Sequence, residues 1–180
     1  MRKILLTWLT TALVMTAAIP AGAQTEEEKL AASVEELRNA AGSWSVTTEF
    51  LAADGSVARE IEGEYVFEWV VEGRVLSGYN HIPDLDQKSA ILFYINEKEG
   101  NIEMASVGSD GHLWIMTGPL GGDTRYSQEF QSSEGNPSQL RFTRFNVSGD
   151  RFESRMEYTE DGGETWIQGN HQVFTRKKNP

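Results

Sequence analysis

The sequence predicts an all-β protein: an antiparallel up-and-down meander barrel of about ten strands, preceded by a short N-terminal amphipathic helix. After Gly42, polar and apolar residues alternate through most of the chain, as they do in half-buried strands. Clusters of Gly, Asp and Asn interrupt this alternation at near-regular spacing, which is typical of tight turns. Nearly every link is of hairpin length, so parallel strands joined by crossover helices are excluded.

The first 23 residues differ from the rest. Arg2 and Lys3 precede a charge-free apolar run over residues 4–19, and Ala21 and Ala23 then form a small-x-small pattern. This order predicts a secretory signal peptide over 1–23, cleaved after Ala23. The alternative is a membrane anchor, but the apolar run is shorter than the roughly 20 residues of a spanning helix.

Composition limits the environment and the partners. Removing 1–23 leaves 157 residues, which fits a single domain. The chain has no cysteine, so an exported protein of this kind suits a bacterial periplasm or cell exterior. The net charge is −11, and −13 without Arg2 and Lys3. Because such a charge repels phosphates and anionic lipids, we expect no nucleic-acid or membrane partner for the mature protein.

Residues 24–42 are predicted to form the N-terminal helix. Thr25 can cap it, and Glu28 follows three residues later, as in a capping box. Gly42 can end it. One apolar stripe at helical spacing predicts that the helix packs on the domain: Leu30, Val34, Leu37 and Ala41.

Residues 43–180 are predicted to form the barrel. A sandwich would usually include longer crossovers, and a long meander removes its exposed edges by closing. An outer-membrane barrel is disfavoured because the outward positions carry many charges and no aromatic girdle is present. We expect strands near 44–52, 57–72, 74–82, 89–96, 101–108, 112–118, 124–131, 139–148, 151–159 and 165–177.

A tryptophan and an arginine mark the two ends of the predicted barrel. Trp44 follows Gly42 by two residues, and Arg176 lies near the close of the last strand. The first and last strands of an up-and-down barrel are neighbours, so the guanidinium can cover the indole ring. This Gly-x-Trp with a C-terminal arginine resembles the calycin superfamily of lipocalins and fatty-acid-binding proteins. The whole mature chain is similar to exported lipocalin-like bacterial proteins of unknown function, which implies that Trp44 and Arg176 are structural.

The segment TEDGGETW, residues 159–166, resembles the Asp-box of sialidase-like propellers. In that motif the aspartate and a glycine fix a hairpin turn and the tryptophan packs beneath. The motif recurs once per blade, but this chain has it once and is too short for a propeller. We therefore interpret Asp161 and Trp166 as structural residues of one turn.

A closed barrel of this size encloses either side chains or a small-molecule cavity. Apolar walls with a few polar groups are typical of a ligand site. Arg125, Arg141 and Arg155 lie on predicted strands; any that points inward would select an anionic group such as a carboxylate. Pairing with glutamates on the outer face is the alternative. The candidate ligand-binding residues are Tyr79, His81, Tyr94, Met104, Trp114, Met116, Arg125 and Arg141.

The sequence offers no catalytic constellation. His81, His112 and His171 lack metal-motif spacing, so we predict no metal site and no cofactor. Nitrobindin-like barrels hold haem through a histidine, and that resemblance makes His171 the alternative axial ligand. We favour a small-molecule binding protein over two alternatives: a filled barrel that acts as an interaction scaffold, and an enzyme that uses His81 and His112.

Overall fold

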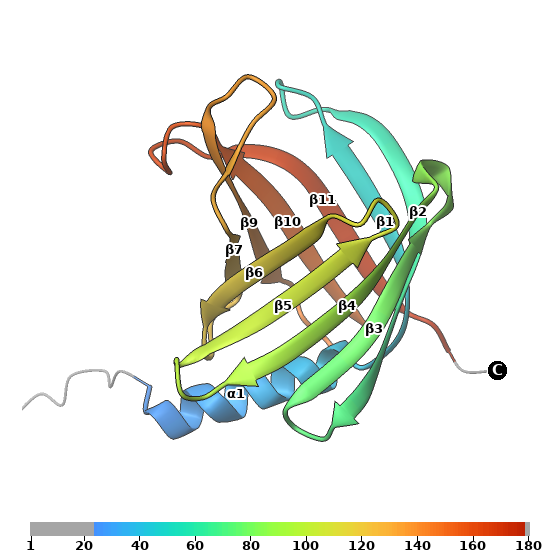
Figure 1. Cartoon of the computed structure of the whole chain (residues 1–180). Helices are drawn as coiled ribbons and strands as arrows, with labels where there is room; N and C mark the ends of the chain where they lie inside the picture. Colours follow the sequence, from blue (N-terminus) through green and yellow to red (C-terminus); the bar gives the residue numbers. More distant parts are fainter. Residues whose placement is uncertain (1–23, 179–180) are drawn as a thin grey trace, which may run out of the picture.

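The computed structural model describes residues 24–178 and shows a closed barrel with one helix lying across one end (Figure 1). The signal peptide predicted over 1–23 lies outside the described residues. The helix is α1 (Glu26–Ala40), and a 3-10 turn, η1, spans Pro83–Leu85. The strands are β1 (Gly42–Leu51), β2 (Val57–Val71), β3 (Val75–Ile82), β4 (Gln87–Asn96), β5 (Asn101–Gly108), β6 (Leu113–Pro119), β7 (Thr124–Ser127), β8 (Phe130–Gln131), β9 (Pro137–Phe145), β10 (Arg151–Thr159) and β11 (Ile167–Arg176).

The described strands form an antiparallel meander that closes on itself. Neighbours in the sheet are also neighbours in the chain from β1 to β7, and β9, β10 and β11 complete the circuit. Pairing of β11 with β1 closes the barrel. Strand β8 pairs only with β9, so ten strands make up the barrel wall. The predicted fold class is confirmed.

The strand predicted over 124–131 is wrong in one respect, because the structure divides it into β7 and β8. Beyond Tyr126 the regular pairing with β9 stops. The Ser127 hydroxyl accepts the hydrogen bond from the Leu140 amide at 2.9 Å, and the Gln139 side chain donates to the Ser127 carbonyl at 2.9 Å. Side chains here take the place of ladder hydrogen bonds, which a pattern of alternation does not reveal.

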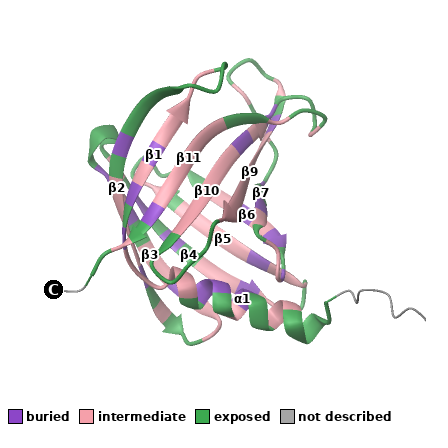
Figure 2. Ribbon diagram, turned by 180° about the vertical axis from the view of Figure 1, so that it is seen from behind, coloured by how far each residue is buried: buried purple, intermediate pink, exposed green. Residues whose placement is uncertain are grey.

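Helix α1 begins and docks as its sequence indicates. The Thr25 hydroxyl accepts from the Glu28 amide at 3.2 Å, and the Glu28 carboxylate accepts from the Thr25 amide at 2.8 Å. Ser33, Glu36 and Leu37 are buried on the barrel side of the helix. Figure 2 shows these buried positions against the otherwise half-buried and exposed helix. Among the described helices, none is long and apolar enough to cross a membrane.

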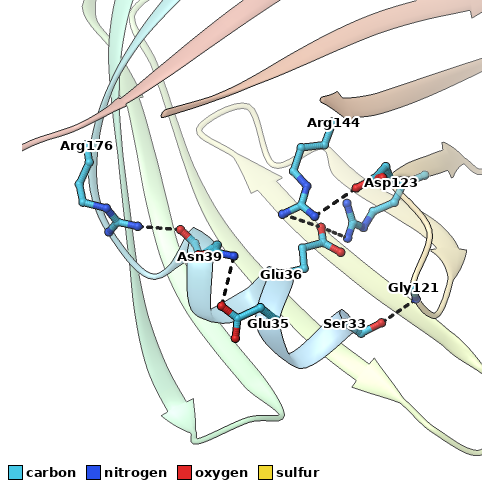
Figure 3. Close-up of polar contacts among 9 residues, drawn as sticks. Ser33, Glu35, Glu36, Asn39, Gly121, Asp123, Arg144 and Arg176 are labelled. Carbon is cyan, nitrogen blue, oxygen red and sulfur yellow. Dashed lines mark hydrogen bonds and ion pairs between the residues drawn. The ribbon is translucent and has the colours of Figure 1, made fainter. Parts of the chain in front are cut away.

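Arg176 holds the end of α1 to the base of the barrel. Its guanidinium donates to the carbonyls of Asn39, Ala41 and Gly149 at 2.8, 2.7 and 2.9 Å (Figure 3 shows the bond to Asn39). It also lies 4.2 Å from the centre of the Trp44 ring, where the sequence places the contact. Because the last carbonyls of a helix lack partners within it, these bonds satisfy groups that would otherwise be unpaired.

The glycine of Gly-x-Trp has a steric reason. Gly42 adopts a φ of +121°, and a Cβ there would lie 2.5 Å from the Arg176 Nη1 atom. Trp44 is fully buried and donates its Nε1–H to the Ala40 carbonyl at 2.8 Å. Its ring packs edge-on against Phe152 at 4.9 Å between ring centres. The motif therefore joins the first strand, the last strand and the helix in one apolar cluster.

We predict that Arg176→Ala lowers the free energy of unfolding by about 2–4 kcal/mol, because it removes three charge-assisted hydrogen bonds and the cation–π contact. Arg176→Lys keeps the charge but not the planar fork, so it is expected to recover only part of this loss. Urea unfolding followed by tryptophan fluorescence measures both. The exposed Arg59→Ala is the control, and equal stability of Arg176→Ala and Arg59→Ala would contradict the structural role.

Candidate functional site

A cavity of about 330 Å³ lies inside the barrel. Alternate residues of the strands point into it, and α1 covers it at the base. Its walls are mostly aromatic rings and thioethers, which favour an apolar ligand. These wall residues are Tyr65, Phe67, Phe93, Met104, Trp114, Met116, Phe142, Phe152 and Phe174.

A cluster of charged side chains lies where the cavity meets α1. Arg125 of β7 forms an ion pair and hydrogen bond with Glu36 of the helix. Arg144 of β9 lies 3.9 Å from the same Glu36 oxygen, and its other terminal nitrogen is 3.1 Å from Asp123 (Figure 3). Arg125 is 8% exposed and Glu36 is 7% exposed. Because a buried guanidinium keeps its charge, the two arginines share one buried carboxylate, Glu36, while the second carboxylate of the cluster, Asp123, is 59% exposed.

Three buried polar atoms along the cavity wall have no hydrogen-bond partner in the protein. They are the Nε atoms of Arg125 and Arg144 and the Oδ1 atom of Asn80. A buried polar group without a partner is costly, and native structures contain few of them. Two donors at the base and one acceptor on β3 are thus left unsatisfied by the protein.

Tyr65 gives the apolar wall a further polar group. Burial raises the pKa of its phenol, and hydrogen bonding with Asn80 and Gln172 partly opposes that rise. The phenol therefore stays protonated and neutral across the physiological pH range. It can donate or accept a hydrogen bond inside the cavity without adding charge.

Four of the sequence-predicted ligand-binding residues line the cavity together. Met104 and Met116 are paired across β5 and β6, Trp114 lies two residues before Met116 on β6, and Arg125 lies on the neighbouring β7. Arg125 also lies 5.6 Å from the centre of the Phe93 ring. The structure places these four residues in one site, while their role in ligand binding stays a prediction.

The other four predicted residues lie outside the cavity. Tyr79 and His81 point away from the barrel interior and border a solvent-facing depression on β3 and β4. Tyr94 donates a hydrogen bond to Glu103 on the outer face. Arg141 pairs with Glu157 at 2.7 Å and covers the Trp166 ring at 4.2 Å. Alternation fixed which residues share a face, but not which face is inward.

The histidines also lie away from the cavity. His171 is on the outer face of β11, where its two ring nitrogens lie 2.9 Å from Glu49 and Glu153. With both nitrogens occupied outside the barrel, the haem-ligand alternative has no support. His112 is exposed and packs on Trp114 at 4.7 Å, and His81 is outside, so the enzyme alternative loses its proposed internal pair. No group of described side chains is arranged to hold a metal ion.

The hairpin between β10 and β11 has the geometry expected of an Asp-box turn. The Asp161 carboxylate accepts hydrogen bonds from the amide and hydroxyl of Thr165 and from the Thr159 hydroxyl. These bonds, those of Thr165 foremost, lower the pKa of Asp161 to about 2. Trp166 packs under Arg141 and beside Tyr126, so the motif serves the barrel wall.

Among the polar residues of the site that sequence reasoning missed are Glu36, Asn80 and Arg144. Arg144 shares a face with Phe142, two residues away, and that alternation was a usable signal. Glu36 lies three residues after Ser33 on the buried face of α1, one position away from the apolar stripe. A glutamate beside such a stripe is usually solvated, so no sequence signal distinguished it.

Comparison with known proteins shows similarity in fold. No protein-family model and no curated protein sequence matches this chain. Rv2717c from M. tuberculosis aligns with a TM-score of 0.52 and 14% identity over 81% of this chain and 98% of that chain. The S-type phycobiliprotein lyase CPES from Guillardia theta aligns with a TM-score of 0.49 and 12% identity, over 88% and 100% of the two chains. At 14% identity, the likeness to Rv2717c supports the barrel fold alone.

The outer-face histidine predicts a pH-dependent contribution to stability. Partial burial opposes the charge on His171, but hydrogen bonds with Glu49 and Glu153 outweigh it and raise its pKa above 6.5. The protonated ring therefore stabilises the fold below the unfolded-state pKa of 6.5, and this contribution is lost as the pH rises through the folded-state value.

We predict that the stability lost on His171→Gln is larger near about pH 5.5 than near about pH 8.5. Urea unfolding of both proteins at the two pH values measures this difference. A loss of stability that does not change with pH would contradict the ion-pair assignment.

Proposed function

We propose that this protein is exported and holds a small, largely apolar ligand with one acidic group inside its barrel. The acidic group lies at the base beside Arg125 and Arg144, and the apolar body lies between the aromatic walls. One observation carries the proposal. Arg125 is buried at the end of an apolar cavity and has an unpartnered Nε–H.

The ligand's acidic group follows from the charges at the base. The two arginines share one buried carboxylate, Glu36, so a single carboxylate or similar anion in the cavity would supply a second buried partner. Charge-assisted hydrogen bonds from arginine to an anion are stronger than neutral ones and are directional. Asp123 contacts Arg144 from the surface, where water screens its charge.

The apolar body follows from the walls and from the volume. A cavity of about 330 Å³ is at the small end of ligand sites, which span about 300–1,000 Å³. It is also too large for a solidly filled barrel, which weakens the interaction-scaffold alternative. Aromatic rings on opposite walls favour a flat or ring-containing ligand, since rings stack or pack edge-on with one another.

Two observations support the wider assignment to exported, calycin-type carriers. Trp44 under Arg176 is the pair on which the resemblance to that superfamily rests, and the two residues are in contact. The basic, apolar and small-residue order of residues 1–23 supports export and cleavage after Ala23.

Two dyes with the same body test the proposal. ANS (1-anilinonaphthalene-8-sulfonate) carries one sulfonate, and N-phenyl-1-naphthylamine is its neutral counterpart. We expect the protein to bind both dyes. Arg125→Gln should lower the affinity for ANS by at least about tenfold and change the affinity for the neutral dye by less than about twofold. Fluorescence titration measures all four affinities.

Arg141→Gln is the matched control, because Arg141 lies on the outer face of the neighbouring strand. Its affinity for both dyes should equal that of the unchanged protein. Failure of the unchanged protein to bind either dye would contradict the proposed function. If Arg125→Gln and Arg141→Gln lowered the affinity for ANS equally, the assignment of the acidic group to the cavity would be contradicted.

A cavity-filling substitution gives an independent prediction. Ser106 lines the cavity beside Trp114, its pairing partner across β5 and β6, whereas its neighbour Ala105 points outward. Ser106→Phe is expected to lower the affinity for both dyes by more than about tenfold, because the added ring occupies the apolar volume. Ala105→Phe should leave both affinities unchanged, and circular dichroism checks that each variant is folded. Unchanged binding by Ser106→Phe would place the dyes outside the barrel.

A further inference from the structure

The Glu36 carboxylate contacts the guanidinium groups of Arg125 and Arg144, which the proposed ligand would also bind. One of its carboxylate oxygens contacts Arg125 and lies 3.9 Å from the Arg144 guanidinium. The side chain comes from α1, outside the barrel wall, and lies with Leu37 and Ala40 along the cavity. A carboxylate of the chain itself is therefore bound at the arginines.

A ligand anion that enters the cavity meets this carboxylate. Two negative groups at the same pair of arginines repel each other strongly in a buried, low-dielectric site. Glu36 and the exposed Asp123 already match the two arginines in charge, so neither guanidinium is free of a carboxylate. The anion must then share the arginines with Glu36 or replace it.

The contacts of α1 indicate which part of the helix would move if a ligand anion replaced Glu36 at the arginines. The C-terminal end of the helix is held by Arg176 through Asn39 and Ala41. Near its middle, the polar contacts to the barrel are Glu36 with the arginines and Ser33 Oγ, which accepts from the Gly121 amide at 2.9 Å (Figure 3). Loss of the Glu36 contacts would thus loosen the helix over the cavity while its C-terminal end stays attached.

We propose that Glu36 is a specificity-determining residue that competes with the ligand's acidic group for Arg125 and Arg144, so that binding of an anion loosens α1. This inference rests on the proposed function. It adds that Glu36 regulates the anion site. An anion that binds the arginines weakly does not displace Glu36, and an anion that does bind changes the mobility of α1.

Glu36→Gln tests the competition. The variant removes the competing charge but keeps a side chain of nearly the same size. We expect its affinity for ANS to rise by about tenfold, with less than about twofold change for N-phenyl-1-naphthylamine. Glu35→Gln is the control, since Glu35 is exposed and pairs only with groups of its own helix, Arg38 and Asn39. Unchanged or weaker ANS binding by Glu36→Gln would overturn the inference.

Different experimental results would disprove the carrier function and the competition by Glu36. If the unchanged protein binds ANS through Arg125 but Glu36→Gln gives no increase, the carrier function stands and the competition is wrong. If neither protein binds either dye, both are wrong.

Glu36→Gln leaves two buried arginines without their buried partner and so can fail to fold. The double variant Glu36→Gln/Arg144→Gln removes one charge of each sign and so keeps the net charge of the unchanged cluster. Competition predicts that it binds ANS at least as tightly as the unchanged protein. A purely structural Glu36 predicts weaker binding, because one anion-binding arginine is gone.

Hydrogen exchange on the unchanged protein tests the movement without any substitution. At equal saturation, ANS should speed amide exchange in the stretch 33–38 of α1 relative to N-phenyl-1-naphthylamine, by about tenfold or more. Equal exchange with the two dyes would overturn the link between anion binding and the helix.

Discussion

A guanidinium cannot shed its charge, so a buried arginine needs a partner wherever the fold places it. Arg125 lies inside the barrel near its base, and within residues 24–178 no strand supplies an acidic residue that contacts it. Glu36 of α1 supplies the partner instead, and that contact fixes which face of the helix turns inward. Arg144 lies 3.9 Å from the same carboxylate and pairs with the exposed Asp123 at 3.1 Å, so Glu36 is the buried carboxylate that both arginines share. The helix position and the ligand preference thus depend on one ion pair.

The base of the barrel supports that ion pair from the other end of the helix. Arg176 binds the last carbonyls of α1 while lying over Trp44, and Gly42 leaves room for its guanidinium. Trp44 also packs with Phe152, whose ring lines the cavity. A residue pair with a structural role therefore forms part of the wall that a ligand would contact.

The alternating pattern was enough to predict the barrel, because each strand has a polar and an apolar face and each turn carries its own residues. It could not assign the inward face where both faces are mixed. On β3, the exposed Tyr79 and the half-buried His81 flank the buried Asn80, and on β9 the outward Arg141 precedes the inward Phe142. Arg125 and Arg141 are alike in sequence, and only their register against neighbouring strands separates them. Glu36 was beyond prediction, since its partners are about 90 to 110 residues away and meet it only after the barrel closes.

A crystal structure of the mature protein with ANS would test the central claim most directly. The account predicts the naphthalene and phenyl rings between the walls of the cavity, and a sulfonate oxygen within hydrogen-bonding distance of Arg125 or Arg144. Glu36 should then be displaced from at least one arginine. A dye bound on the outer face of the barrel, or one inside it with the sulfonate at the end away from α1, would contradict the account.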